Sequence, residues 1–373
     1  MKIKSLLKLL AGLLIILNVE GLTKNYRQVD STFQFQDSTI QKIWEVKNDT
    51  TASAEILVSN NKIFYTLDDG LVFCYDFNGN EKWIAEVFGN IKNNSVQYKD
   101  LFLTATQGGD LYSINSNNGD VLQVIGVGEN ITTDLILVDV VNSGYESKGV
   151  IFGTGAGNIF CYDIFSFEIV WKINLSKNSI ISKPLFINDK IIFKDNLSSL
   201  YCVNAKSGIL IWKYDFDVKE NKNNNSLLLG SGNKIYALSP NDEVVAFDLM
   251  LGKKVWSTKN LNVFPQITFS EDRQNFILLG KKGELLFLSS KDGKEINKIE
   301  LMKENITSFY YNFSDRIKLF AFSDGSLYRM DDTFVLKELL RPNGERITSI
   351  KLLQENQFIA STINGKITFY KIN

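Results

Sequence analysis

Short runs of alternating apolar and polar residues fill most of the chain, and Gly, Asp and Asn separate the runs. Between residues 62 and 87 the runs are KIFYTL, LVFCYDF and EKWIAEV, and the separators are DDG and NGN. β-Branched and aromatic residues in two-residue alternation favour strands, and the separators are typical of hairpin turns. Since no segment shows a helical period of 3.6, the pattern predicts an all-β protein.

The same unit recurs along the chain. A reference position, glycine in most units, lies six residues before an aspartate-like position, and consecutive reference positions are 39, 48, 41, 44, 41, 42 and 40 residues apart. The eight reference positions are Gly70, Gly109, Gly157, Ser198, Asp242, Gly283, Gly325 and Gly365. A period near 40 that continues over eight units predicts an array of structural repeats.

Each unit holds three clear strands, and polar links such as NNSVQYKD leave room for a fourth. Four-stranded antiparallel units must bury both sheet faces against their neighbours, and radial packing does so while leaving short edges. The pattern therefore predicts one eight-bladed β-propeller over residues 38–373. The last unit, GKITFYKIN, stops without an outer strand, and QKIWEV (41–46) stands alone near the start. We expect this N-terminal strand to complete the last blade and close the ring.

One phrase is repeated closely in two units, as AFDLMLGKKVW (246–256) and CVNAKSGILIW (202–212). An Asp or Asn side chain can accept hydrogen bonds from the turn that follows it, and glycine can take the positive φ that a hairpin needs. We therefore predict a structural turn role for Asp76, Asp163, Asn204, Asp248, Gly208 and Gly252.

The tryptophans share one place in the repeat. All five of them fall at the same register of the predicted outer strand: Trp44, Trp83, Trp171, Trp212 and Trp256. A flat side chain that recurs in this way can bury about 150–250 Å² against the neighbouring blade. We predict that these tryptophans dock the blades to one another.

The N-terminus is typical of an export signal. Lys2, Lys4 and Lys8 precede an apolar stretch from Leu9 to Val19 that is short for a membrane span. We expect residues 1–21 to be a signal peptide, with an uncleaved anchor as the alternative, and residues 22–37 to be a linker. The protein is thus expected to be exported. No cysteine follows the apolar stretch, so no lipid-attachment signal is visible.

Composition narrows the function. The 373 residues are 44% apolar and carry 41 basic against 42 acidic side chains, so no global field favours nucleic acid. Histidine is absent, which removes the usual general base and the commonest metal ligand. Cys74, Cys161 and Cys202 are too few and scattered for a disulfide framework. Their common place in the repeat predicts small buried strand residues.

The pattern small-x-Asp-x-x-x-Gly-x-x-x-Trp in AFDLMLGKKVW resembles the tryptophan-docking motif of pyrroloquinoline-quinone-like (PQQ-like) propeller repeats. The resemblance covers nearly all of residues 40–373. Three units depart from it, with Gln123, Asn297 and Lys337 in the tryptophan column. The competing WD40 repeat has a Trp-Asp dipeptide, which this chain lacks.

An exported propeller of this subclass is similar to the BamB family of outer-membrane assembly factors. The resemblance implies a non-enzymatic scaffold without a cofactor, whose partners are envelope proteins such as the β-barrel insertion machinery. Members of that family are commonly lipoproteins. Two alternatives stay open: an exported sensor or ligand-binding propeller, and a PQQ-dependent dehydrogenase. Chains of the second kind are longer, and many have two adjacent cysteines, whereas the cysteines here stand alone.

Three segments are candidate partner surfaces. The longest interval inserts VNSGYESKG (141–149), and another contains KENKNNNS (219–226), which reads as a solvent-facing loop. In NITSFYYNF (305–313) the aromatic residues cannot all face inward from a simple strand. We therefore predict that Tyr310 or Tyr311 contributes to partner binding.

Overall fold

The computed structural model describes residues 35–37, 40–181, 183–217, 228–259, 261–301, 305–314, 317–354 and 356–373. The predicted signal peptide or anchor (1–21), most of the predicted linker (22–37) and the loop at 219–226 lie outside the described residues.

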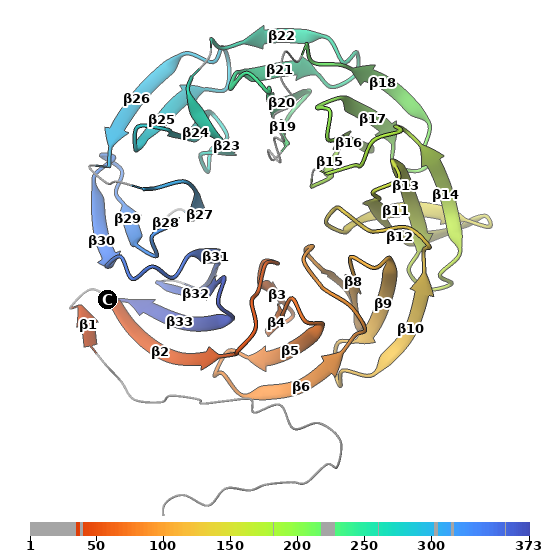
Figure 1. Cartoon of the computed structure of the whole chain (residues 1–373), viewed down its shortest axis with the longest axis horizontal. Coiled ribbons are helices and arrows are strands. Elements are labelled where there is room, and N and C mark those ends of the chain that lie inside the picture. The colour runs from red at the N-terminus through yellow and green to blue at the C-terminus, as the bar shows by residue number, and fades with distance from the viewer. Residues whose placement is uncertain are drawn as a thin grey trace, which may run out of the picture.

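The described chain forms eight antiparallel sheets arranged as blades around a central axis (Figure 1). This arrangement confirms the predicted eight-bladed propeller. Blades 1 to 7 take four consecutive strands each, from β3 to β30, and blade 8 combines the two ends of the chain. In the part of the chain that the structure describes, no helix is long and apolar enough to cross a membrane.

Strands at the same place in each blade share a radial position. The innermost strands are β3 (Leu57–Ser59), β7 (Val96–Tyr98), β11 (Ile136–Asn142), β15 (Leu185–Ile187), β19 (Leu229–Ser231), β23 (Val263–Phe269), β27 (Phe309–Phe313) and β31 (Ile347–Gln354). The second strands are β4 (Lys62–Thr66), β8 (Leu101–Ala105), β12 (Tyr145–Gly153), β16 (Lys190–Lys194), β20 (Lys234–Leu238), β24 (Asn275–Gly280), β28 (Lys318–Phe322) and β32 (Gln357–Thr362).

The outer half of each blade follows the same order. The third strands are β5 (Leu71–Asp76), β9 (Asp110–Asn115), β13 (Asn158–Asp163), β17 (Leu200–Asn204), β21 (Val244–Asp248), β25 (Glu284–Ser289), β29 (Leu327–Met330) and β33 (Lys366–Ile372). The outer strands are β6 (Glu81–Glu86), β10 (Val121–Gly126), β14 (Ile169–Asn174), β18 (Leu210–Tyr214), β22 (Lys254–Ser257), β26 (Glu295–Glu300), β30 (Leu336–Leu340) and β2 (Ile40–Lys47).

The N-terminal strand closes the ring, as predicted. β2 pairs antiparallel with β33, with Trp44 opposite Phe369 and Val46 opposite Ile367. Figure 1 shows β2 beside β33 in blade 8. One feature was not predicted: β1 (Phe35–Asp37) pairs with the outer edge of β2, so blade 8 has a fifth strand. Three residues of the predicted linker therefore belong to the sheet.

The core lies between blades. Second and third strands are buried along nearly their whole length, because a neighbouring blade covers each face of these strands. The buried apolar residues form eight clusters, and each cluster combines two adjacent blades. In one of them Ile192 and Cys202 of blade 4 pack with Ile235 and Phe247 of blade 5. The ring is thus held by apolar burial at its junctions.

The reference position of the repeat has one backbone conformation. It lies at the turn between second and third strands, and φ is positive in all eight blades: Gly70 (97°), Gly109 (98°), Gly157 (79°), Ser198 (70°), Asp242 (58°), Gly283 (79°), Gly325 (83°) and Gly365 (75°). At Gly70 a Cβ atom would lie 2.3 Å from the carbonyl oxygen of Val87. Glycine here admits the close approach of the chain that leads to the next blade.

All three cysteines are buried strand residues, as predicted. They lie opposite tryptophans on the neighbouring strand: Cys74 faces Trp83, Cys161 faces Trp171 and Cys202 faces Trp212. Burial raises the pKa of the Cys74 thiol to about 11 and those of the other two to about 12. A small residue at this position leaves room for the indole.

Candidate functional site

Each tryptophan ring lies against a turn of the next blade. A Cβ atom on Gly252 would lie 2.5 Å from the Trp212 ring, so the ring occupies the space that a side chain would need. The other rings lie against glycines in the same way, with Trp44 at Gly79, Trp83 at Gly119, Trp171 at Gly208 and Trp256 at Gly293. This geometry is the one expected of an inter-blade wedge.

Four of the five indoles also make a hydrogen bond across the junction. The Nε1 atoms donate to backbone oxygens of the same turns: Trp44 to Phe77 (3.0 Å), Trp83 to Ser116 (3.1 Å), Trp171 to Ala205 (3.0 Å) and Trp212 to Leu249 (2.9 Å). The Nε1 atom of Trp256 is buried and has no hydrogen-bond partner among the described residues. The junction between blades 5 and 6 therefore lacks a bond that four others have.

The turn under each ring has its own anchor. Oδ1 of Asp248 accepts hydrogen bonds from the backbone N–H groups of Met250 and Leu251, each at 2.8 Å. The equivalent acceptors under an indole are Asp76 for Asn78 and Asn80 and Asn204 for Lys206 and Ser207, while Asp163 accepts from Phe165 and Ser166 in the blade 3 turn, which no indole covers. Gly208 and Gly252 have φ of 68° and 65°. The anchored turn presents a bare glycine to the indole.

A different contact occurs where blade 2 meets blade 3. Gln123 stands in the tryptophan column and is exposed. In the turn of blade 3, Phe167 takes the place that glycine has elsewhere, with a φ of 56°. Its side chain is buried in the cluster that joins the two blades, beside Leu103 and Leu111. The aromatic ring thus comes from the turn instead of the outer strand.

The junction between blades 6 and 7 repeats this exchange. Asn297 stands in the tryptophan column, and Phe334 of the following turn has a φ of 63°. The Phe334 ring packs against Phe287 of blade 6, with ring centroids 5.0 Å apart. Neither phenylalanine was predicted from the sequence. The available signal was an aromatic residue in the glycine position of blades 3 and 7, which follow the Gln123 and Asn297 units; blade 8, which follows the Lys337 unit, has no turn between its third strand and its outer strand β2.

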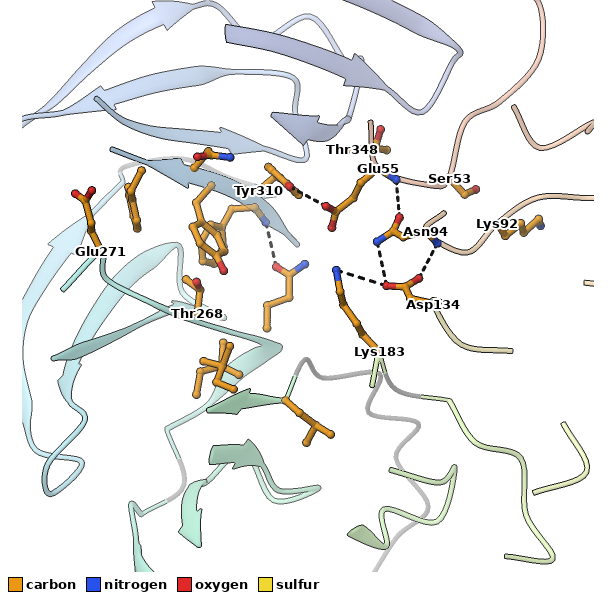
Figure 2. Close-up of a pocket in the computed structure, with 18 residues that line it drawn as sticks. Ser53, Glu55, Lys92, Asn94, Asp134, Lys183, Thr268, Glu271, Tyr310 and Thr348 are labelled. Carbon is orange, nitrogen blue, oxygen red and sulfur yellow. Dashed lines mark hydrogen bonds and ion pairs between the residues drawn. The ribbon is translucent and has the colours of Figure 1, made fainter. Parts of the chain in front are cut away.

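A cavity of about 730 Å³ opens at the centre of the ring (Figure 2). Its wall includes residues from blades 1 to 8, chiefly from the links that lead into innermost strands and from β23 and β27. One part of the wall is polar and charged, and another is aromatic and apolar. A space of this size falls in the range of ligand pockets.

The repeat itself builds the polar wall. Glu55, Asn94, Asp134 and Lys183 each lie two residues before the first strand of a blade, in blades 1 to 4. The backbone N–H of Glu55 donates to Oδ1 of Asn94 (2.7 Å), and that of Asn94 donates to Oδ1 of Asp134 (2.8 Å). Nζ of Lys183 lies 3.6 Å from Oδ2 of Asp134. Figure 2 shows this chain of contacts along the cavity wall.

A charged cluster crosses the place where the ring closes. Nζ of Lys351 lies 2.7 Å from Oε2 of Glu55, and the Tyr310 hydroxyl donates to the same oxygen at 3.2 Å. Burial alone would raise the pKa of Glu55, but the charges of Lys351 and Lys183 and the two hydrogen bonds outweigh it and hold the pKa below its usual value. The carboxylate thus ties blades 7 and 8 to the start of blade 1.

Tyr310 and Tyr311, the predicted partner-binding residues, lie in the aromatic wall of the cavity and are half-buried. Phe309 and Phe313 from the same strand, β27, also reach the cavity. Burial raises the pKa of both tyrosines, and the neighbouring Glu55 carboxylate raises it further. A partner would have to insert a side chain or a segment into the cavity to contact them.

Among the described residues there is no group of three or more His, Cys, Asp or Glu side chains that could hold a metal ion. The acidic side chains Glu55 and Asp134 each lie against a lysine. What the wall offers a ligand is a set of hydrogen-bonding groups on one side and aromatic faces on the other.

A family model described as outer membrane protein assembly factor BamB matches residues 34–189, 136–259 and 168–329. Together these matches span most of the chain. The chain belongs to this family. The overlapping matches follow from the internal repeat, because one model can align with the blades in several registers.

The family includes a curated relative. The outer membrane protein assembly factor BamB of Shewanella oneidensis is 19% identical over 300 residues, which cover 77% of this chain and 72% of that protein.

Solved structures share the fold. BamB from Moraxella catarrhalis superposes with a TM-score of 0.72 at 13% identity, covering 89% of this chain and 99% of that one. Sqt1 from Saccharomyces cerevisiae gives a TM-score of 0.72 at 13% identity over 88% and 98% of the two chains. The computationally designed protein Ika8 gives 0.69 at 13% identity over 87% and 98%. Since the three names differ, the shared fold does not by itself assign a function.

Proposed function

We propose that this protein is a non-catalytic, exported scaffold that takes part in the assembly and insertion of outer-membrane β-barrel proteins. Its family membership over residues 34–329 carries the proposal. The rigid ring supports it, since burial at eight junctions fixes the positions of the loops that a partner would contact. The work of such a scaffold is affinity and geometry, and it requires no bond-making chemistry.

The N-terminal residues support a location in the cell where the protein would act. Residues 1–21 have the charges and the apolar stretch of an export signal, with an uncleaved anchor as the alternative, and residues 22–34 would link it to β1. The protein would then act in the periplasm or on the periplasmic side of the outer membrane.

Crosslinking in the native cell tests this role. The tagged protein is captured after crosslinking, and the proteins recovered with it are identified by mass spectrometry. We expect subunits of the β-barrel insertion machinery, and we expect depletion of the protein to lower the amount of folded outer-membrane barrels. An unrelated periplasmic protein with the same tag is the control. Recovery of other envelope proteins only, with normal barrel levels, would contradict the proposal.

The aromatic wall is the proposed place for an inserted partner segment. Replacing Tyr310 and Tyr311 together with alanine removes two aromatic rings from the cavity wall. We therefore expect less recovery of the partner. Phe88→Ala is the matched control, because Phe88 is 84% exposed and lies outside the cavity wall and outside the candidate partner segments. Unchanged recovery from a double variant that still folds would refute a binding role for these tyrosines.

A second candidate function is that of an exported sensor or ligand-binding propeller. The observation in its favour is the central cavity of about 730 Å³, with a hydrogen-bonding wall on one side and an aromatic wall on the other. Native mass spectrometry of protein purified gently from its own host tests it. A bound small molecule that the double tyrosine variant loses would favour this function; a bound quinone would favour the dehydrogenase alternative.

A further inference from the structure

One part of the rim combines positive charge with exposed apolar side chains. Each of blades 1 to 7 has a rim segment, which runs from the last residue of its third strand, through the turn, to the end of its outer strand. The rim segments of blades 4 and 5, residues 204–214 and 248–257, have formal net charges of +2 and +1, because lysine outnumbers aspartate there. The rim segments of the other five blades are neutral or negative.

The turns of these two segments expose apolar side chains. Met250 and Leu251 lie between β21 and β22 and are 52% and 63% exposed. Ile209 lies between β17 and β18 and is 65% exposed, and Leu210, the first residue of β18, is 43% exposed. The turn does not require such residues, since the equivalent turn of blade 6 has the sequence SSKDGK (289–294) and still places its glycine against a tryptophan ring.

Trp212 joins the two turns into one patch. It lies two residues after Leu210 on β18, its ring lies against Gly252 of the next blade, and its Nε1 atom donates to the Leu249 oxygen. The apolar residues just before Trp212 therefore lie beside the turn of blade 5. Figure 1 shows β18 and β22 as consecutive strands on the rim. We call the following residues the rim patch: Lys206, Ile209, Leu210, Met250, Leu251, Lys253 and Lys254.

The three lysines of the rim patch form no ion pair with any described residue, whereas Lys213 of blade 4 pairs with Asp215 at 2.8 Å. The Nζ atom of Lys254 has a neutral neighbour, the Ser257 hydroxyl at 3.3 Å. The acid of the same turn, Asp248, accepts hydrogen bonds from backbone N–H groups of that turn. The charges of these lysines are thus left for an anionic partner.

We propose that the rim patch binds the surface of an anionic phospholipid membrane. Its apolar residues lie in or beside turns that end at the solvent, so they can insert together into a fluid interface, which needs no matching groove. Apolar side chains at the boundary between headgroups and acyl chains, with lysines beside the phosphates, are a combination that holds peripheral proteins on anionic lipid.

The topology places the rim patch away from the polar wall of the cavity. The chain enters each blade at a link that leads into the innermost strand, and it passes through three antiparallel strands before it reaches the turn to the outer strand. Since three is an odd number, the links and these turns lie at opposite ends of the blade. A ring that contacts lipid through the rim patch would therefore keep the polar wall at the end of the blades that faces away from the lipid.

Hydrogen exchange with lipid vesicles tests the proposal on the exported protein as purified. We expect backbone amides of residues 205–209 and 249–253 to gain protection from vesicles that contain phosphatidylglycerol, and not from vesicles of phosphatidylcholine alone. The signal is local, so binding through the N-terminal residues cannot produce it. Three results would overturn the proposal: no protection, equal protection by both kinds of vesicle, or protection that appears only when another envelope protein is added.

A substitution in the turn of blade 5 tests insertion of the apolar residues. Leu251→Asp should raise the lipid concentration for half-maximal protection of residues 249–253 at least about tenfold, because a carboxylate would face anionic lipid. Val335→Asp is the matched control, since Val335 lies in the turn of blade 7 and is 58% exposed. This control should bind as the native protein does, and an equal loss in both variants would contradict the assignment.

A pair of lysine substitutions tests the charge. Lys253→Gln combined with Lys254→Gln should raise the same lipid concentration about fivefold for each lysine, and added salt should then weaken binding less than it does in the native protein. Lys291→Gln combined with Lys294→Gln, in the equivalent turn of blade 6, is the control. Equal effects of the two pairs would refute binding through the rim patch. None of these results depends on whether the protein acts in outer-membrane assembly.

Discussion

Two kinds of aromatic contact occur at seven of the eight junctions between blades; the junction of blades 7 and 8, with Lys337 in the tryptophan column, has neither among the described residues. In five of them a tryptophan on the outer strand of one blade lies against a bare glycine in the turn of the next. In two others the outer strand carries Gln123 or Asn297, and the turn supplies Phe167 or Phe334. In the first kind the outer strand of one blade supplies the aromatic ring at the junction, and in the second kind the turn of the next blade supplies it.

The comparison shows what the junction requires. In Gly208, Gly252, Phe167 and Phe334 alike, φ is positive, so the turn keeps its conformation whichever residue occupies it. Glycine is needed where an indole covers the turn, because a Cβ atom would collide with the ring. Where no indole is present, a phenylalanine can accept the backbone strain, which costs about 1–2 kcal/mol, in exchange for packing its ring against the preceding blade; Phe167 is buried there, whereas Phe334 stays 38% exposed.

The largest effect is expected from removal of a ring. Trp212→Ala and Phe167→Ala should each lower the free energy of unfolding by about 3–5 kcal/mol, since both leave a cavity between two blades. Urea denaturation measures both. Gln123→Ala is the control, because its exposed side chain should matter by no more than about 0.5 kcal/mol. A small effect of Phe167→Ala would show that the two kinds of junction are not equivalent.

A methyl group on the glycine tests the space beneath the indole. Gly252→Ala should cost about 2–4 kcal/mol, because the Cβ atom would lie 2.5 Å from Trp212 and the residue keeps a φ of 65°. Gly232→Ala is the matched control, with a φ of 58° and no atom within 4 Å of the added Cβ. It should cost about 1–2 kcal/mol from backbone strain alone. Equal losses in urea denaturation would contradict the close contact.

The stability that the cluster of Glu55, Lys351 and Tyr310 contributes depends on pH, whereas the stability that the aromatic junctions contribute does not. The folded state holds the pKa of Glu55 below its ordinary value of 4.5, so the carboxylate stabilises the protein above that pH, and the contribution is lost as the pH falls through the folded pKa. Glu55→Gln should cost about 1–2 kcal/mol at pH 7 and progressively less as the pH falls below 4.5.

Urea denaturation at several pH values between 7 and 3 measures this loss. Trp212→Ala is the control, because it should lower stability by the same amount throughout that range. A Glu55→Gln variant with the same pH slope as the native protein would show that the cluster with Lys351 and Tyr310 contributes nothing.

The smallest expected effect is a difference in stability loss between substitutions of two tryptophans. Trp212→Phe removes the hydrogen bond from Nε1 to the Leu249 oxygen, whereas the Nε1 atom of Trp256 has no partner among the described residues. Trp212→Phe should therefore cost about 1 kcal/mol more than Trp256→Phe. Thermal unfolding of both variants checks the difference. A larger loss for Trp256→Phe would mean that ring packing outweighs the hydrogen bond.

Much of this architecture could be predicted because it repeats. The eight reference positions, from Gly70 to Gly365, fixed the number of blades, and QKIWEV near the start indicated how the ring closes. The central cavity could not be predicted from the sequence. Glu55, Asn94 and Asp134 are unremarkable polar residues in three separate links, and nothing local shows that the ring aligns them.

The sequence by itself determined the strands, their order and the turns, because these depend on alternation within a few residues and on residues suited to positive φ. Only the tertiary structure decided which side supplies the ring at each junction, that Tyr310 and Tyr311 face a central cavity, and that the turns of blades 4 and 5 form one patch on the rim. The physical reason is the same in each case. These features arise from contacts between residues of different blades, such as Trp44 with Phe77, 33 positions apart, and Tyr310 with Glu55, 255 positions apart, and local patterns contain no information about the neighbour across such a gap.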